Sequence, residues 1–297
     1  MYLDDSYFLF WLSVLGLCFG SFFNVVILRS LSGESIVFPS SKCPKCGNSL
    51  KPWHNIPVLS YLFLRGKCAF CRGSISIQYP IIELITMGLF VYSFINFGIS
   101  LKTVFAIIIC SILLIMSVTD IREQLVDCNL AIGLAIIGIL YNWLVNNTQV
   151  DSIFGLFLGV IIMEIISRLG YFLKKGRVFG EADTYVIGAL GACFGMFGVL
   201  KILIYTLIVS TIFIVPIFIY KLLKNNNKIE LFLLILFTLT SLFYKFYFEN
   251  WIILCLIIIF GLFLVYFILR DVKTEVSLTY LPLVPAISVA SLYFLFF

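Results

Sequence analysis

Long apolar runs recur along almost the whole chain, and they limit its fold more than any other feature. A helix needs about 20 apolar residues to cross the hydrocarbon core of a bilayer, and the chain offers ten segments of roughly this length. These segments cover residues 7–28, 81–97, 101–119, 129–146, 152–173, 184–199, 202–221, 230–247, 251–269 and 278–296. Because 62% of the 297 residues are hydrophobic and only 12% are charged, a single soluble core could not bury the apolar surface. The sequence therefore predicts an all-α polytopic membrane protein.

The distribution of basic residues predicts the orientation of these helices. If the N-terminus faces outward, the outer turns hold only three of the 20 Lys and Arg residues, namely Lys102, Lys201 and Lys245. Cytoplasmic loops normally carry the excess of such residues, so we expect both termini on the outer side of the membrane. The first apolar run follows Asp4 and Asp5 with no basic residue before it, which favours a retained helix over a cleaved signal peptide. No extended basic face is available for nucleic acid.

One long polar segment, residues 29–80, interrupts the apolar pattern between the first two predicted helices. It is too short and too polar to build a large core, and a domain of about 50 residues usually needs a metal or disulfides to hold it. We therefore expect a first membrane helix in residues 1–28, a small cytoplasmic domain in 29–80, and a membrane core in 81–297. Within that core, we expect residues 230–269 to form an additional pair of helices.

Four cysteines in the polar segment form two CxxC pairs. Cys43 and Cys46 are separated from Cys68 and Cys71 by 21 residues, a pattern that lets four thiolates converge on one tetrahedral ion. Two disulfides are the alternative, which the reducing cytoplasm disfavours. Four sulfur ligands leave no open position, so the predicted Zn²⁺ is structural. His54, the single histidine, is expected to be a surface residue.

Two carboxylates are predicted to meet at the cytoplasmic face of the membrane. Asp120 ends the third predicted helix in SVTDIREQLVD, and Asp183 begins the sixth in GEAD, between the small residues Gly180 and Ala182 and the apolar run. Two close carboxylates share a proton, and such a pair can act as acid and base in peptide hydrolysis. The alternative for each is a helix cap at the interface, the role that we favour for Asp127.

Five segments together resemble one family of membrane enzymes. They are GLCFGSFFNVVILR (16–29), CPKCGNSLKPWHNIPVLSYLFLRGKCAFCRGSISIQYPIIE (43–83), SVTDIREQLVD (117–127), GEAD (180–183) and LTYLPLVPAISVA (278–290). The sequence resembles the type IV prepilin peptidases, also called leader peptidase/N-methyltransferases, which are GxGD-type membrane aspartyl proteases. GEAD departs from GxGD at Ala182, Val126 stands where the family usually has proline, and residues 230–269 exceed the usual eight helices.

The resemblance implies an activity and a set of residues. Such enzymes remove the basic leader of prepilins and pseudopilins on the cytoplasmic side, and many then methylate the new N-terminus with S-adenosylmethionine. Asp120 and Asp183 occupy the catalytic positions by motif match. Other positions match those associated with the cytoplasmic loop and methyl transfer: Asn24, Arg29, Asn55, Arg65, Tyr79 and Glu83.

Three alternatives to this function stay open at the level of the sequence. The enzyme could cleave without methylating, because no Gly-rich loop of the kind found in soluble methyltransferases is present. A transporter could use its carboxylates to relay protons, although both Asp residues are expected at the membrane edge and not at mid-membrane. A non-enzymatic scaffold could use the zinc domain to dock pilus or secretion proteins.

Overall fold

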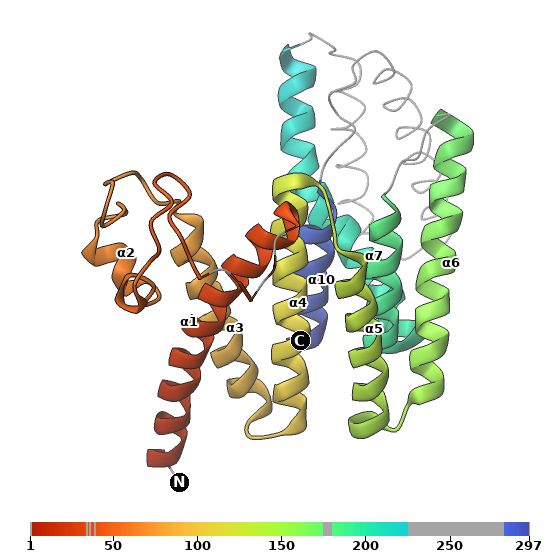
Figure 1. Ribbon diagram of the computed structural model, residues 1–297. Helices are drawn as coiled ribbons and strands as arrows, with labels where there is room; N and C mark the ends of the chain where they lie inside the picture. The colour runs from red at the N-terminus through yellow and green to blue at the C-terminus, as the bar shows by residue number, and fades with distance from the viewer. Residues whose placement is uncertain are drawn as a thin grey trace. The chain divides into compact units, whose positions relative to one another are not determined.

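The structure is a computed structural model that describes residues 2–33, 35, 37–38, 40–174, 180–224 and 282–296. Its regular elements are all helices (Figure 1). In chain order they are α1 (Tyr2–Ser32), the 3₁₀ turn η1 (Pro52–His54), α2 (Leu59–Phe63), α3 (Gln78–Phe97), α4 (Leu101–Glu123), α5 (Cys128–Tyr141), the π-helical turn η2 (Asn142–Asn146), α6 (Gln149–Lys174), α7 (Glu181–Lys224) and α10 (Val284–Phe296).

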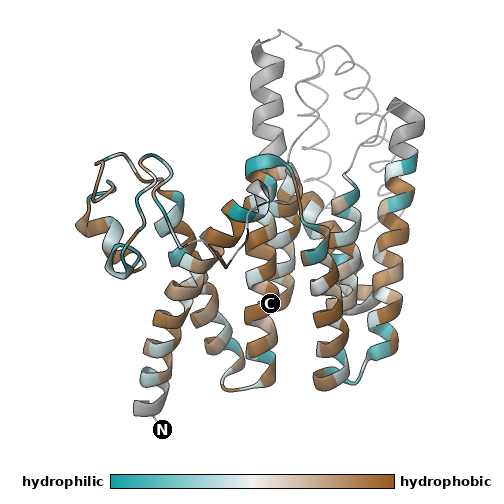
Figure 2. Cartoon of the chain, in the orientation of Figure 1, coloured by the Kyte–Doolittle hydropathy of each residue, from teal (hydrophilic) through white to brown (hydrophobic). Residues whose placement is uncertain are grey.

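Six of the described helices are long and apolar enough to cross a membrane. They are α1, α3, α4, α5 extended by η2, α6 and α7, and their apolar character is visible in Figure 2. The all-helical membrane fold is thus confirmed, whereas the count of ten helices is not. The predicted helices 230–247 and 251–269 lie outside the described residues, and the last predicted segment, 278–296, contains the shorter apolar helix α10.

The predicted segments 184–199 and 202–221 fall within one element, α7, which is interrupted at Gly195. This residue has φ 74° and ψ −176°, which no helix residue adopts. The break therefore lies before the gap at 200–201 that hydropathy suggested. A glycine has no Cβ and takes positive φ at little cost, so the chain can break here inside an otherwise continuous apolar run.

The chain divides into two compact units, residues 1–206 with 282–297, and residues 207–281. The first unit holds every residue that the sequence singled out as a candidate site. In the second, the described residues are 207–224, the C-terminal part of α7. The helices, the core and the site below belong to the first unit.

Small residues let α1 approach α3 closely. A Cβ on Gly16 would lie 2.7 Å from Cα of Met87, and one on Gly20 would lie 2.6 Å from Cα of Glu83. Lipid tails are as apolar as leucine, so helices in a bilayer associate through close packing and hydrogen bonds. The GxxxG spacing of Gly16 and Gly20 supplies such a contact, and it fixes the position of α3 relative to the first helix.

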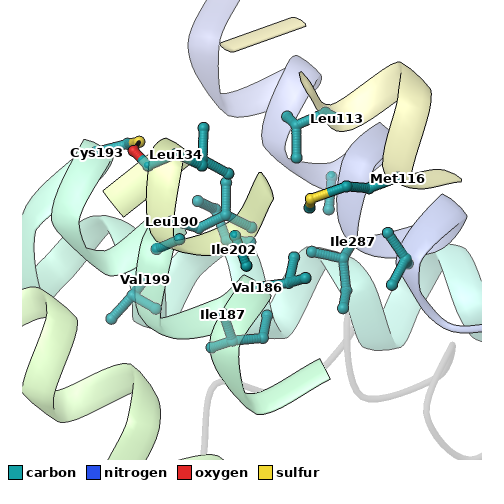
Figure 3. Close-up of a cluster of buried hydrophobic side chains, with 14 of the residues drawn as sticks. Leu113, Met116, Leu134, Val186, Ile187, Leu190, Cys193, Val199, Ile202 and Ile287 are labelled. Carbon is teal, nitrogen blue, oxygen red and sulfur yellow. Dashed lines mark hydrogen bonds between the residues drawn. The ribbon is translucent and has the colours of Figure 1, made fainter. Parts of the chain in front are cut away.

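A cluster of buried apolar side chains joins α4, α5, α6, α7 and α10 (Figure 3). The figure labels Leu113, Met116, Leu134, Val186, Ile187, Leu190, Cys193, Val199, Ile202 and Ile287. Because α4, the first half of α7 and α10 all contribute to this cluster, the ends of these helices are held in fixed relation. Those ends carry the candidate carboxylates.

The break at Gly195 leaves carbonyl groups of α7 without helical partners, and polar side chains of neighbouring helices satisfy them. Nδ2 of Asn142 donates to the carbonyls of Ala192 and Cys193 at 2.8 and 2.9 Å, and Ser152 Oγ donates to Ala192 at 2.6 Å. The N–H of Met196 donates to Oδ1 of Asp151 at 3.1 Å. Unsatisfied backbone groups are costly inside a bilayer, so these contacts make the break tolerable.

Candidate functional site

The four paired cysteines of the loop between α1 and α3 converge. The Sγ atoms of Cys43, Cys46, Cys68 and Cys71 all lie within 4.8 Å of one another, and all four are free thiols. A tetrahedral Zn²⁺ with Zn–S bonds of about 2.3 Å needs sulfur atoms about 3.8 Å apart. Small side-chain adjustments would bring the four sulfurs onto one ion, so the cluster fits a metal of this type.

The two CxxC turns are built alike, which explains why their sulfurs face one point. In the first turn, Gly47 N–H donates to the Cys43 carbonyl at 2.8 Å; in the second, Arg72 N–H donates to the Cys68 carbonyl at 3.0 Å. Gly47 and Arg72 also share positive φ, 71° and 54°. Lys45 Nζ links the turns through a 2.9 Å hydrogen bond to Ser74 Oγ.

The thiols of this cluster do not titrate alike without a metal. Backbone N–H groups of Cys71 and Phe70 lower the pKa of Cys68 to about 7. The pKa of Cys46 is raised to about 11: the backbone N–H of Asn48 opposes the rise, but burial and the neighbouring Cys43 and Cys71 thiols outweigh it. A bound cation attracts thiolates and offsets their mutual repulsion. It therefore holds all four sulfurs in the deprotonated form.

Asp120 lies in the last turn of α4, where Gln124 takes the left-handed conformation and closes the helix onto the Asp120 carbonyl. Its side chain is buried. Oδ2 accepts a 3.0 Å hydrogen bond from the backbone N–H of Val284, the first residue of α10. The first N–H groups of a helix have no partner within that helix, and they attract anions. The start of α10 therefore orients this carboxylate.

Asp183 occupies the first turn of α7 and is held in a similar way. Its Oδ2 accepts a 3.2 Å hydrogen bond from the backbone N–H of Gly180, directly before the helix. The Asp120 carboxyl group interacts electrostatically with that of Asp183. Two helices distant in sequence thus place two carboxyl groups within electrostatic range, and each accepts a hydrogen bond from a backbone amide at a helix N-terminus.

Comparison with known proteins identifies the family. Residues 14–97 match the Bacterial Peptidase A24 N-terminal domain, and residues 107–219 match the Type IV leader peptidase family. A prepilin leader peptidase/N-methyltransferase of Neisseria gonorrhoeae is 33% identical over 65% of this chain and 76% of its own length. The chain belongs to the type IV leader peptidase family. This membership favours an enzyme over the transporter and scaffold alternatives.

Two other members of the family are also similar to this chain in sequence. A prepilin leader peptidase/N-methyltransferase of Myxococcus xanthus is 33% identical over 65% of this chain, and the match spans 58% of that protein. One of Bacillus subtilis is 44% identical over 39% of this chain and 46% of its own length. No solved structure gave a significant match.

The leader peptidase motif residues beside the two Asp residues have structural roles. Asp127 caps α5, as the sequence predicted: its Oδ1 accepts a 2.8 Å hydrogen bond from the N–H of Asn129. Gly180 supplies the amide that Asp183 accepts from. Ala182, the departure from GxGD, lies in the first turn of α7 and is partly buried.

Three of the residues predicted to support methyl transfer lie where α1 and α3 cross. Asn24 is fully buried, and its Nδ2 donates to the Tyr79 carbonyl at 3.2 Å. Its Oδ1 is buried without a hydrogen-bond partner. Glu83 is also buried, and its Oε2 accepts a 2.7 Å hydrogen bond from the N–H of Val58. Asn24, the Tyr79 carbonyl and Glu83 thus form a cluster of polar groups at the crossing, next to the loop.

The other three residues of that set lie at the end of α1 and on the loop between α1 and α3. Arg29, near the end of α1, donates from Nη1 to the Ser35 carbonyl at 2.9 Å. Asn55 follows η1 and is exposed, and Arg65 follows α2, is exposed and has φ 51°. The structure thus places Asn24, Tyr79 and Glu83 at the helix crossing, Arg29 at the end of α1, and Asn55 and Arg65 on the surface of the loop.

Two residues that contact the site were missed by sequence reasoning. One feature of the sequence indicated a helix start near Val284: Pro285 follows it, and proline favours the first turn of a helix. No such feature pointed to Val58, which adopts φ 60° and ψ −50° in a tight turn, with Leu59 N–H donating to the Pro57 carbonyl. A β-branched residue rarely takes this strained conformation.

Proposed function

We propose that this leader peptidase removes the leader of type IV prepilins and pseudopilins at the cytoplasmic face of the bacterial inner membrane, with Asp120 and Asp183 as the catalytic pair. The observation that supports this most is the pairing itself. The two carboxyl groups come from α4 and α7, interact electrostatically, and each accept a hydrogen bond from a backbone amide. Such a pair keeps one proton between two acids.

A shared proton is sufficient for peptide hydrolysis. The ionised carboxylate takes a proton from a water molecule, whose oxygen attacks the scissile carbonyl carbon. The protonated carboxyl group donates its proton to the carbonyl oxygen, which gives a tetrahedral diol. When that diol collapses, the C–N bond breaks, the leaving amine takes the proton of one carboxyl group, and a diol hydroxyl returns a proton to the other carboxylate. The apolar helix of a prepilin would lie in the bilayer, so its scissile bond reaches the depth of Asp120 and Asp183.

The test is cleavage of a prepilin by membranes that contain the protein. Asp120→Asn and Asp183→Asn keep side-chain size and remove an ionisable group, and general acid–base catalysis contributes about 10²–10⁴-fold. We expect each variant to lose at least this factor in rate. Glu123→Gln is the matched control: it removes an exposed carboxylate from the last turn of α4 and should cleave normally. Normal cleavage by either Asp variant would exclude the pair.

We further propose that the protein methylates the new N-terminus. S-adenosylmethionine would supply the methyl group. Its positively charged amine and sulfonium suit the buried Glu83 carboxylate, and the unpartnered Oδ1 of Asn24 offers a further acceptor. The residues Arg29, Asn55, Arg65 and Tyr79 are proposed to support this activity.

Methyl transfer and cleavage are separable by mass spectrometry of the mature pilin. Glu83→Gln should yield a correctly cut N-terminus that lacks the added methyl mass. If the wild-type protein also gives only unmethylated product, the alternative of cleavage without methylation holds. If Glu83→Gln gives fully methylated product, Glu83 has no part in binding the methyl donor.

The metal and the orientation complete the proposal. We propose that the four cysteines hold a structural Zn²⁺, since a set of four thiolates leaves no position for water or substrate. We also propose that the N-terminus lies outside and the loop between α1 and α3 in the cytoplasm, which the basic residues of that loop support. Reporter fusions at Gly47 and at Asn147, which are expected on opposite sides, test this topology.

A further inference from the structure

The loop between α1 and α3 carries an apolar surface that the described residues leave uncovered. It consists of five side chains and is called here the α2 surface: Trp53, Ile56, Leu59, Leu62 and Phe63. Phe63 is 83% exposed and Leu62 63% exposed. Exposed aromatic and aliphatic side chains clustered on one short segment usually mark a contact surface.

A hydrogen bond sets the depth of this surface relative to the membrane helices. Glu83 lies five residues into α3 (Gln78–Phe97), a helix whose whole length is a candidate membrane span. At 1.5 Å per residue, Glu83 is about 7.5 Å along that span from its cytoplasmic start. Its Oε2 accepts from the N–H of Val58, the residue directly before α2. The start of α2 is therefore held at the depth of the second turn of α3.

The neighbouring face of α3 agrees with this depth. Ile81, Leu84 and Ile85 are exposed large apolar side chains on the same turns as Glu83, and in a membrane protein such side chains contact lipid. The α2 surface is thus tied to a part of the protein that lipid surrounds. Aromatic residues such as Trp53 and Phe63 are favourable at that level, where apolar and polar layers meet.

The charge of the loop indicates which lipids it suits. From residue 35 to residue 82 the chain contains no Asp or Glu, and it contains six basic residues, namely Lys42, Lys45, Lys51, Arg65, Lys67 and Arg72. Four thiolates on a divalent cation would offset only part of this charge. The exposed Lys51 has its ammonium 5.2 Å from the Trp53 ring, so a basic group and an interfacial aromatic ring are presented together.

We propose that the α2 surface inserts into the interface of the cytoplasmic leaflet, with Leu62 and Phe63 among the upper acyl chains and the basic residues of the loop on anionic phospholipid headgroups. Short apolar segments with basic rims bind membranes in this way. The metal-binding loop is then held against the bilayer by lipid as well as by α1 and α3. This proposal concerns lipid contact and stands whether or not the protein cleaves prepilins.

Fluorescence quenching tests the insertion in the full-length protein in nanodiscs. Trp11, Trp53, Trp143 and Trp251 are replaced by Phe, and Phe63→Trp supplies the probe. We expect phospholipids brominated on the acyl chain to remove most of the emission and aqueous iodide to remove little. Strong quenching by iodide would place position 63 in water and overturn the proposal. Protection from both quenchers would mean that protein covers the surface, which overturns it equally.

A second probe and a fold check keep this result interpretable. Leu62→Trp in the same background samples the same surface independently, and it should show the same quenching by brominated lipid. Metal content equal to that of the unmodified protein shows that the loop has kept its fold in both variants. If the two probes disagree about lipid contact, α2 does not lie flat in the interface, and the proposal fails.

Lipid composition tests the role of charge. Nanodiscs of phosphatidylglycerol with phosphatidylcholine should give more bromolipid quenching than phosphatidylcholine alone, and the double substitution Lys51→Gln, Lys67→Gln should remove that difference. Lys102→Gln is the matched control, because Lys102 is exposed at the opposite end of α4 from Asp120. If quenching is insensitive to anionic lipid, or if the control has the same effect as the double substitution, headgroup recognition by the loop is excluded.

Discussion

The backbone N–H of Val284 donates a 3.0 Å hydrogen bond to Oδ2 of Asp120, across 164 positions of sequence. The first residue of α10 thereby holds the carboxylate at the end of α4. This contact gives the last described helix of the chain a direct role at the proposed catalytic pair. The α10 helix has no acidic residue in its first turn and no basic residue in its last turn. Its contribution to the site is therefore this backbone amide.

Removing this amide should impair cleavage without unfolding the protein. Val284→Pro eliminates the N–H, and proline is well accepted at the first position of a helix. A hydrogen bond to a charged group is worth about 1.5–3 kcal/mol, which corresponds to about 10–100-fold in rate if it is lost fully in the transition state. Prepilin cleavage by purified protein measures the effect. Val284→Ala keeps the donor and should lose much less activity; an equal loss in both would attribute the effect to packing.

The equivalent amide at Asp183 gives a second, independent prediction. Gly180→Pro removes the N–H that Oδ2 of Asp183 accepts from, and cleavage should fall by a similar factor of about 10–100. Gly180→Ala keeps the donor. A Cβ there would meet only Oδ2 of Asp183, at 3.5 Å, among the side-chain atoms nearby. We therefore expect the alanine variant to cleave at a nearly normal rate, and a comparable loss in it would argue against the amide.

The four-cysteine cluster predicts a metal that acid and chelators remove. Purified protein should contain stoichiometric zinc, and Cys43→Ser should lose it, as measured by elemental analysis. Zinc binds thiolates, so its affinity falls as the pH is lowered and protons compete for the sulfurs. The Cys46 thiol, with its pKa raised to about 11, is protonated at pH 8 without metal. Uptake of Zn²⁺ at that pH should therefore release protons, and a metal titration without proton release would contradict thiolate ligation at Cys46.

Gly195 should be one of the most sensitive glycines of the first compact unit. A side chain there must adopt φ 74° and would collide with the Asp151 carboxylate. Strained backbone of this kind costs about 1–3 kcal/mol, so Gly195→Ala should lower the unfolding temperature in detergent measurably. Gly133→Ala is the matched control, because that position is within α5 and an added Cβ would meet nothing within 4 Å; alanine there should leave stability equal or higher by up to about 1 kcal/mol.

Hydropathy alone located most of the described helices, because a bilayer demands long apolar runs. The first five predicted segments each correspond to one observed helix. It misplaced the interruption of α7, since the break depends on Gly195 adopting positive φ and on Asp151, Asn142 and Ser152 satisfying the freed backbone groups. Those partners come from other helices, and a local hydropathy window does not contain them.

For the candidate site, too, the sequence predicted some features and the structure supplied others. CxxC spacing predicts a metal site because the two thiolates of one turn already point in a similar direction. The two turns also converge: the sulfurs of Cys43 and Cys71, one from each turn, lie 4.0 Å apart. Equal membrane depth predicts that Asp120 and Asp183 lie close together. Membrane depth does not indicate which groups orient the two carboxylates, and the sequence did not predict the contact with Val284.

By itself, the amino-acid sequence determined that this chain belongs in a bilayer and that its polar loop carries four cysteines spaced for a metal, and it predicted that two acidic residues lie near one face of the membrane. Each of these follows from local composition or spacing, which lipid and metal chemistry constrain directly. Only the tertiary structure decided which backbone amides hold Asp120 and Asp183, how a strained Val58 ties the loop to Glu83, and where α7 breaks. These depend on contacts between helices distant in sequence, and no local pattern encodes them.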